Sequence, residues 1–132
     1  MKTRAQRVGR WGEKLAADYL CQSGYSLLEQ NTRTSFGEID LIACQPPGDD
    51  PTRSEPCIVF VEVKTRTNSS FGMPEESVTL KKQAHLLAAA QAYLQAHPEL
   101  VGAWRIDVIA IRSAGPGHPP EILHFENAII GE

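Results

Sequence analysis

The feature that most constrains this chain is an apolar segment, Ile58–Lys64, that carries two opposite charges. Glu62 and Lys64 lie two residues apart, and because side chains alternate across a β-strand, both project from the same face. Charges are rare in such apolar runs, since burying one without a partner is costly. A second apolar segment, residues 39–43, carries one carboxylate, Asp40. Two carboxylates and a lysine at the ends of adjacent strands predict a divalent-metal site that suits phosphodiester hydrolysis.

Length and composition bound the class of protein. The 132 residues allow one domain with a single hydrophobic core. No stretch approaches the ~20 apolar residues of a membrane span, and no apolar stretch follows the basic N-terminus as in a secretory signal. The three cysteines are odd in number and show no C-x-x-C spacing, which favours reduced thiols over a zinc knuckle or a disulfide framework. We therefore expect a single domain over residues 1–132 that is cytoplasmic and does not contact a membrane.

The charge distribution bears on nucleic-acid binding. The formal net charge of −3 argues mildly against it. Positive charges are nevertheless grouped in two places: Lys2, Arg4, Arg7 and Arg10 near the N-terminus, and Arg66, Lys81 and Lys82 further on. A basic face on an acidic chain is therefore compatible with this sequence.

Apolar periodicity predicts two helices and five strands. The helices are expected over residues 4–23 and 79–97, the second with Thr79 as its N-cap. The strands are expected at residues 25–32, 38–44, 57–65, 105–111 and 121–125. Residues 45–56 are rich in proline and read as an irregular loop, and whether this loop covers the site is left open. The order indicates an α/β fold with a mixed sheet flanked by helices.

Four motifs carry a resemblance to a known family: Gly9-x-x-Gly12-Glu13, Phe36–Ala43, Phe60–Arg66 and Gly72-x-Pro74-Glu75. Together with the element order, they resemble the PD-(D/E)XK nuclease superfamily, which has a restriction-endonuclease-like αβββαβ core. More narrowly, residues 7–128 resemble the YraN family of uncharacterised, endonuclease-like bacterial proteins, which are similar to Holliday junction resolvases. The loop at 45–56 looks longer than the connection typical of that family. The resemblance implies a Mg²⁺- or Mn²⁺-dependent endonuclease.

The central site residues follow from both lines of reasoning. Asp40 and Glu62 are the expected Mg²⁺ ligands, and the main-chain carbonyl of Val63 is a third candidate. Lys64 would orient the attacking water or stabilise the negative charge that develops on the phosphate. The Glu-x-Lys triplet is weak by itself, and its alternative reading is a cross-strand ion pair at a sheet edge.

Each of the other candidate residues also has a structural alternative. By resemblance, Glu13 of the first helix points at the metal site, but an exposed helical acid is equally expected. Gln83 either reaches the catalytic centre or is a helix-end glutamine bonded to the backbone. Glu38 could be a further, weaker ligand, but a surface acid at the strand entrance is favoured. For Asp107, a structural pairing with Arg105 is favoured over a role near the site.

The principal hypothesis is a Mg²⁺-dependent endonuclease that acts on DNA, including branched or non-duplex structures. The residues expected to contact phosphates without reading sequence are Arg4, Arg7, Arg10, Arg66, Lys81 and Lys82. A two-fold homodimer would place two sites on two strands, and no organic cofactor is expected. The alternatives are a non-catalytic nucleic-acid-binding module on the same fold and a protein-interaction domain. The choice between DNA and RNA is left open.

Overall fold

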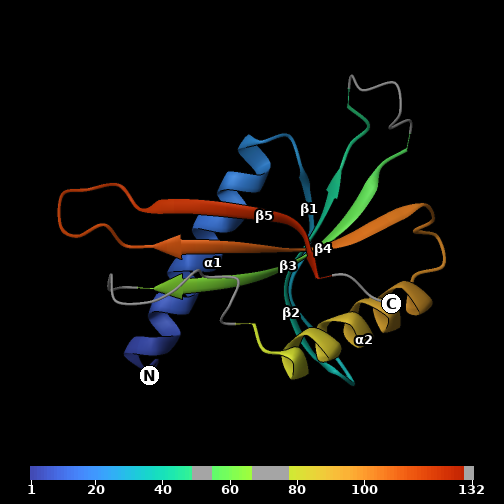
Figure 1. The fold of residues 1–132 in the computed structure, drawn as a ribbon, viewed down its shortest axis with the longest axis horizontal. Coiled ribbons are helices and arrows are strands. Elements are labelled where there is room, and N and C mark those ends of the chain that lie inside the picture. The colour runs from blue at the N-terminus through green and yellow to red at the C-terminus, as the bar shows by residue number, and fades with distance from the viewer. Residues whose placement is uncertain (49–54, 67–77, 130–132) are drawn as a thin grey trace.

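The computed structural model describes residues 1–48, 55–66 and 78–129. Residues 49–54, which are half of the expected loop at 45–56, lie outside the described residues, as does the polar stretch 67–77 with the Gly72-x-Pro74-Glu75 motif. The described elements follow one another in the predicted order (Figure 1): α1 Arg4–Gln22, β1 Ser26–Thr34, β2 Gly37–Gln45, β3 Cys57–Arg66, α2 Leu80–Ala96, β4 Ala103–Arg112 and β5 Glu121–Ile129.

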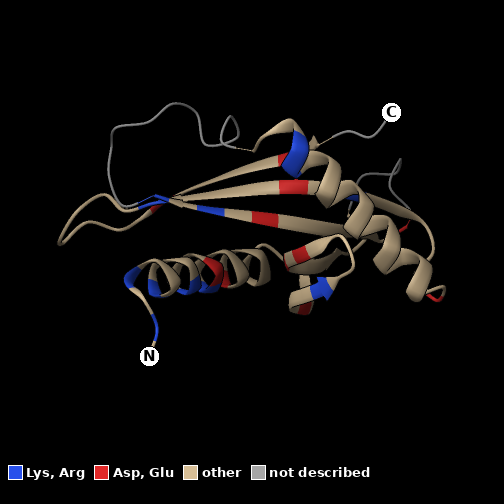
Figure 2. Ribbon diagram, turned by 90° about the horizontal axis from the view of Figure 1, so that it is seen from below, with Lys and Arg blue, Asp and Glu red and all other residues tan. Residues whose placement is uncertain are grey.

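The strands form one five-stranded sheet in the order β1-β2-β3-β4-β5, so that β3 is central. Neighbouring strands are antiparallel except β3 and β4, which are parallel. A parallel pair needs a crossover connection, and α2 lies in the segment that makes it. Figure 2 shows the sheet from its edge, with α1 against one face and α2 against the other. The expectation of a mixed sheet flanked by helices is therefore confirmed.

Each face of the sheet has its own hydrophobic core. On the α1 side, Val59 and Val61 of β3 pack with Ala16 and Leu20. On the α2 side, Phe60 of β3 belongs to a second cluster built on α2. The alternation along β3 places Glu62 and Lys64 on the α2 side, in register with Phe60.

Both helices begin at a threonine cap. The Thr3 hydroxyl accepts a hydrogen bond from the Gln6 N–H at 3.1 Å, and the Gln6 side chain accepts one from the Thr3 N–H at 2.9 Å, which completes a capping box. The Thr79 hydroxyl accepts from the Lys82 N–H at 3.1 Å, so the predicted N-cap of α2 is confirmed. This cap fixes the first turn of α2 beside the carboxylates of the sheet.

Helix α1 approaches β3 closely at one glycine. A β-carbon added at Gly12 would lie 2.1 Å from Oγ1 of Thr65, whereas one added at Gly9 would meet no atom within 4 Å. Gly12 is buried, and its lack of a side chain lets the helix backbone lie against the C-terminal half of β3. This contact fixes the position of the middle turn of α1, which carries Glu13.

Strand β5 is longer than predicted. It was expected to end at Phe125, but it continues to Ile129. The polar residues that follow Phe125 hide this extension in the sequence, and Asn127 has φ 51°. The extension is held from the neighbouring strand, because the Asn127 N–H donates to Oδ1 of Asp107 at 2.8 Å. Among the described residues, no helix is long and apolar enough to cross a membrane.

Candidate active site

Asp40 lies where strands β2 and β3 stop pairing through their backbones. The last backbone pair in this direction joins Leu41 to Val61. At the next position, Oδ2 of Asp40 accepts a hydrogen bond from the Val63 N–H at 2.8 Å. The carboxylate therefore takes the place of a main-chain partner, which holds Asp40 beside the Glu62–Lys64 segment as predicted for adjacent strands.

Glu62 is a buried carboxylate in the central strand, with 6% of its surface exposed. Its Oε1 lies 3.7 Å from Nζ of Lys64 and 3.8 Å from Nζ of Lys82. Its Oε2 is buried and has no hydrogen-bond partner within the part of the chain that the structure describes. A buried oxygen left in this state is unfavourable unless another group satisfies it.

The ionisation of Glu62 and Asp40 is governed mainly by their burial. Burial raises the pKa of Glu62 to about 7, with a further upward contribution from the charge of Asp40. Burial also raises the pKa of Asp40, although the Val63 hydrogen bond opposes this. The positive charges of Lys64 and Lys82 partly offset the rise in the pKa of each carboxyl group. A bound cation would satisfy both carboxylates in their ionised forms.

The donor set fits a magnesium ion. The N–H and C=O of one residue in an antiparallel strand point toward the same neighbouring strand, so we expect the Val63 carbonyl to face the side on which Asp40 lies. Over residues 1–48, 55–66 and 78–129, no group of three or more His, Cys, Asp or Glu side chains converges as a metal site. Mg²⁺ usually needs only one or two carboxylates, with water and substrate phosphates completing its shell. The predicted set of Asp40, Glu62 and the Val63 carbonyl satisfies this requirement. Oε2 of Glu62, which lacks a hydrogen-bond partner among the described residues, is the carboxylate oxygen available to the ion.

Glu13 approaches Asp40 from α1. Burial raises the pKa of Glu13, and the charge of Asp40 is the next largest cause. The Asn31 side chain, oriented to satisfy its neighbours, donates to Oε1 of Glu13 at 3.0 Å and to Oε1 of Glu38 at 3.1 Å. Asn31 has φ 52°, a conformation that asparagine tolerates better than most residues. Glu13 is thus a half-buried acid beside the site, whereas Glu38 is exposed.

A groove of about 410 Å³ opens next to Glu13, between α1 and β1. Its lining is polar and of mixed charge, and includes Arg10, Lys14, Gln30 and Asn31. Of the predicted site residues, Arg10 and Glu13 line this groove, whereas Asp40 and Glu62 do not.

Gln83 is occupied by a backbone contact. Its side-chain amide donates to the Val78 carbonyl at 3.0 Å, which is the structural alternative considered for this residue. Lys82, the preceding residue, is the side chain of α2 that lies next to Glu62. The sequence predicts Lys82 as a phosphate contact or a solvated lysine, and does not predict its contact with Glu62. The sequence signal for this contact is the position of Lys82 three residues after the N-cap Thr79, in the first turn of α2, which lies beside Glu62.

The predicted phosphate-contacting residues come from three elements. Arg4, Arg7 and Arg10 are exposed on α1, Arg66 is half-buried at the end of β3, and Lys81 is exposed in the first turn of α2. Both views place the N-terminal half of α1 at the same end of the molecule as the C-terminal ends of β3 and β4 (Figures 1 and 2). Figure 2 shows positive residues along this half of α1.

A separate polar network is buried on the α1 side of β4. Asp107 is fully buried and accepts from Nε of Arg105 at 2.9 Å, which confirms the expected structural pairing. His124 Nε2 lies 2.7 Å from Oδ2 of Asp107, and its Nδ1 lies 3.0 Å from the Tyr19 hydroxyl. Arg105 also donates to the Tyr25 hydroxyl at 2.8 Å. The network joins α1 to β4 and β5 and contains none of the predicted site residues.

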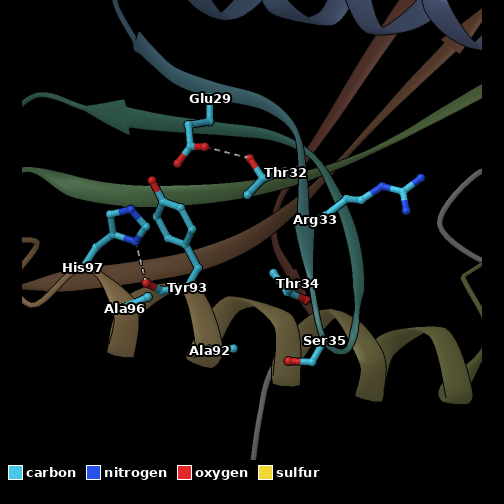
Figure 3. Close-up of a pocket in the computed structure, with 9 residues that line it drawn as sticks. All are labelled: Glu29, Thr32, Arg33, Thr34, Ser35, Ala92, Tyr93, Ala96 and His97. Atoms are coloured by element: carbon cyan, nitrogen blue, oxygen red, sulfur yellow. Dashed lines mark hydrogen bonds between the residues drawn. The ribbon is translucent and has the colours of Figure 1, made fainter.

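A second hollow of about 260 Å³ lies between the β1–β2 hairpin and the C-terminal half of α2. Figure 3 shows that Tyr93 and His97 line it with their rings side by side, whereas the Arg33 side chain points away from them. The two rings stack with centroids 4.0 Å apart. This hollow also contains none of the predicted site residues.

The fold and the site together define an α/β protein with a restriction-endonuclease-like core and a buried carboxylate between two lysines on its central strand. The chain belongs to the family UPF0102, described as an uncharacterised protein family, whose model matches residues 12–111. This is the YraN family that the sequence motifs resemble.

Relatives that carry the family's name match most of the chain. A UPF0102 protein from Syntrophomonas wolfei is 45% identical over 106 residues, which cover 80% of this chain and 84% of the relative. One from Dehalococcoides mccartyi is 38% identical and covers 94% of this chain and 93% of its own. One from Roseiflexus castenholzii is 39% identical, with 98% of each chain covered. None of these names states an activity.

Proposed function

We propose that this protein is a Mg²⁺-dependent endonuclease that hydrolyses phosphodiester bonds in DNA, including branched or non-duplex structures. The observation that carries the proposal is Glu62, a carboxylate buried in the central strand beside Asp40, whose Oε2 has no partner among the described residues. Mn²⁺ is the alternative metal, because it accepts the same oxygen ligands.

Each residue of the site has its own proposed role in phosphodiester hydrolysis. Asp40, Glu62 and the Val63 carbonyl would hold the ion, which when bound supplies positive charge to the phosphate and a more acidic water. Lys64 is half-buried beside Glu62 and would hold the attacking water or stabilise charge on the phosphate. Glu13 would bind a further water on the opposite side of Asp40. Each role depends on the close spacing of these groups at the split between β2 and β3.

The substrate is expected to lie across the end of the sheet that carries the basic residues. Arg4, Arg7 and Arg10 are exposed on α1, and Lys81 is exposed in the first turn of α2. These side chains would contact phosphates and would read no sequence. A second copy of the chain would bring a second site to the other strand. The same proposal places the protein in the cytoplasm, where the DNA of a bacterium lies.

The experiment that tests this function is cleavage of a panel of end-labelled nucleic acids. The panel contains linear duplex DNA, single-stranded DNA, a four-way DNA junction and duplex RNA, each with Mg²⁺, Mn²⁺ or EDTA. We expect cleavage of DNA with either metal and none with EDTA. Salt-sensitive binding without cleavage of any member would instead favour the non-catalytic binding module.

A further inference from the structure

Two ammonium groups contact one oxygen of Glu62. Lys64 and Lys82 lie 3.7 and 3.8 Å from Oε1, one from the same strand and the other from the first turn of α2. Oε2 is the oxygen that is left without a hydrogen-bond partner among the described residues. The carboxylate therefore has one oxygen facing positive charge and one that is available to another group.

The two lysines differ in their freedom to move. Lys64 is 23% exposed and is held by the central strand of the sheet. Lys82 is 39% exposed and reaches the site from the helix, on a long flexible stem. A distance of 3.8 Å is too long for a hydrogen bond, so the Lys82 contact is an ion pair without directional bonding. Lys82 is therefore the cation that can leave Glu62 without disturbing the sheet.

We propose that Lys82 exchanges partners during the reaction: it neutralises the Asp40–Glu62 pair in the free protein and moves to a phosphate oxygen when metal and nucleic acid bind. This inference rests on the proposed function. A divalent ion held by Asp40 and Glu62 would repel a nearby ammonium, and the incoming phosphate would offer it an anionic partner. Lys82 would then be a catalytic residue supplied by α2, in addition to Lys64.

The neighbouring lysine provides a matched control. Lys81 has the same charge, lies in the same helical turn and is exposed. Lys82→Met and Lys81→Met each remove one positive charge and keep most of the aliphatic stem. Thermal unfolding of both variants checks that α2 is intact. Any difference between them then reports the position of the charge.

Two measurements on the full chain test the exchange. The first is calorimetric titration of Mg²⁺ at pH 8.5 without nucleic acid, where Lys82→Met should bind the ion at least threefold more tightly than wild type, because a competing charge is gone. The second is turnover of the best DNA substrate at saturation, where Lys82→Met should lose at least tenfold in kcat. Lys81→Met should leave Mg²⁺ affinity unchanged and, because Lys81 is an expected phosphate contact, should raise the KM for DNA more than it lowers kcat.

The outcomes separate this inference from the proposed function. Wild-type Mg²⁺ affinity and kcat in Lys82→Met, or equal losses in the two variants, would make Lys82 an ordinary surface contact and overturn the exchange. Weaker Mg²⁺ binding by Lys82→Met would also overturn it, because the lysine would then only position Glu62. A wild-type protein that neither binds Mg²⁺ nor cuts would overturn the proposed function itself.

Discussion

Asp40 and Val63 are joined by a hydrogen bond of 2.8 Å from the Val63 N–H to Oδ2 of Asp40. This hydrogen bond ties a side chain of β2 to the main chain of β3 at the residue between Glu62 and Lys64. Asp40 has two properties here that can be tested separately: it accepts this hydrogen bond, and it carries a negative charge. An asparagine at this position could still accept the hydrogen bond, but it would carry no charge. Asp40→Asn is therefore a suitable variant for testing metal binding without breaking the link between the strands.

Divalent metal should stabilise the folded protein. At a Mg²⁺ or Mn²⁺ concentration 100 times the dissociation constant, the gain in unfolding free energy is about 2.7 kcal/mol, and the melting temperature rises accordingly. Asp40→Asn and Glu62→Gln should each lose this shift, because each removes one anionic ligand. Glu99→Gln, an exposed change near the end of α2, should keep it. A shift of equal size in all four proteins would place the metal elsewhere.

Without metal, stability should fall as the pH rises from about 4.5 to about 7. The folded protein raises the pKa of Glu62 to about 7, so over this range the native state binds more protons than the unfolded chain. The contribution of Glu62 is present at low pH and lost at high pH, with a slope of up to about 1.4 kcal/mol per pH unit. Urea denaturation in EDTA measures it. Glu62→Gln should flatten this part of the profile, and an unchanged slope would contradict the assignment.

Two glycines of α1 should respond oppositely to alanine. Gly12→Ala brings a β-carbon against Thr65 and should destabilise the protein by about 1–3 kcal/mol, the usual range for overpacking. Gly9→Ala meets no atom within 4 Å and should stabilise the helix by about 0.5–1 kcal/mol. Urea denaturation of both variants checks the contrast. Thr65→Ala should recover part of the Gly12→Ala loss, and additive effects would show that the two residues are not coupled.

Breaking the buried network at Asp107 should be strongly destabilising. Asp107→Ala leaves the buried Arg105 guanidinium without its main partner and should cost about 3–5 kcal/mol. The surface pair of Arg112 and Glu121 provides the comparison, since Glu121→Gln should cost about 0–1 kcal/mol. Chemical denaturation distinguishes the two ranges. Similar small losses would mean that the network contributes little to stability.

Removing positive charge from α1 should weaken DNA binding and its salt dependence together. For duplex DNA, the slope of log affinity against log salt should fall by about 0.9 for each phosphate that the protein no longer neutralises. We expect the triple variant Arg4→Gln, Arg7→Gln, Arg10→Gln to lower the slope by up to about 2.7 on the same principle. Binding isotherms at several salt concentrations provide this slope. An unchanged slope would exclude this half of α1 from the interface.

The sequence was sufficient to predict the order of elements and the central charges. Helices and strands could be located because apolar residues recur with the period of each element, and Thr79 marks the start of α2. Glu62 and Lys64 share a face because a strand alternates, and this required no tertiary information. The predicted end of β5 at Phe125 was wrong, because Glu126 and Asn127 interrupt the apolar pattern, while a hydrogen bond from Asn127 to Asp107 of the neighbouring strand holds the extension.

Contacts between distant residues could not be predicted in this way. Tyr19 and His124 are 105 positions apart, and only the packing of α1 against the sheet brings them together. The placement of Lys82 against Glu62 depends on the path of α2 across the sheet, which no local pattern contains. Asn31 bridges Glu13 and Glu38 because its backbone adopts a left-handed conformation.

The most direct test of the central claim is the rate of Mg²⁺-dependent DNA cleavage by wild type, Lys64→Ala and Glu62→Gln, purified side by side. The proposed site predicts that wild type cuts and that both variants lose at least 100-fold in rate while remaining folded by circular dichroism. Cleavage that persists at the wild-type rate in either variant would contradict it, because the activity would then come from another site or another protein.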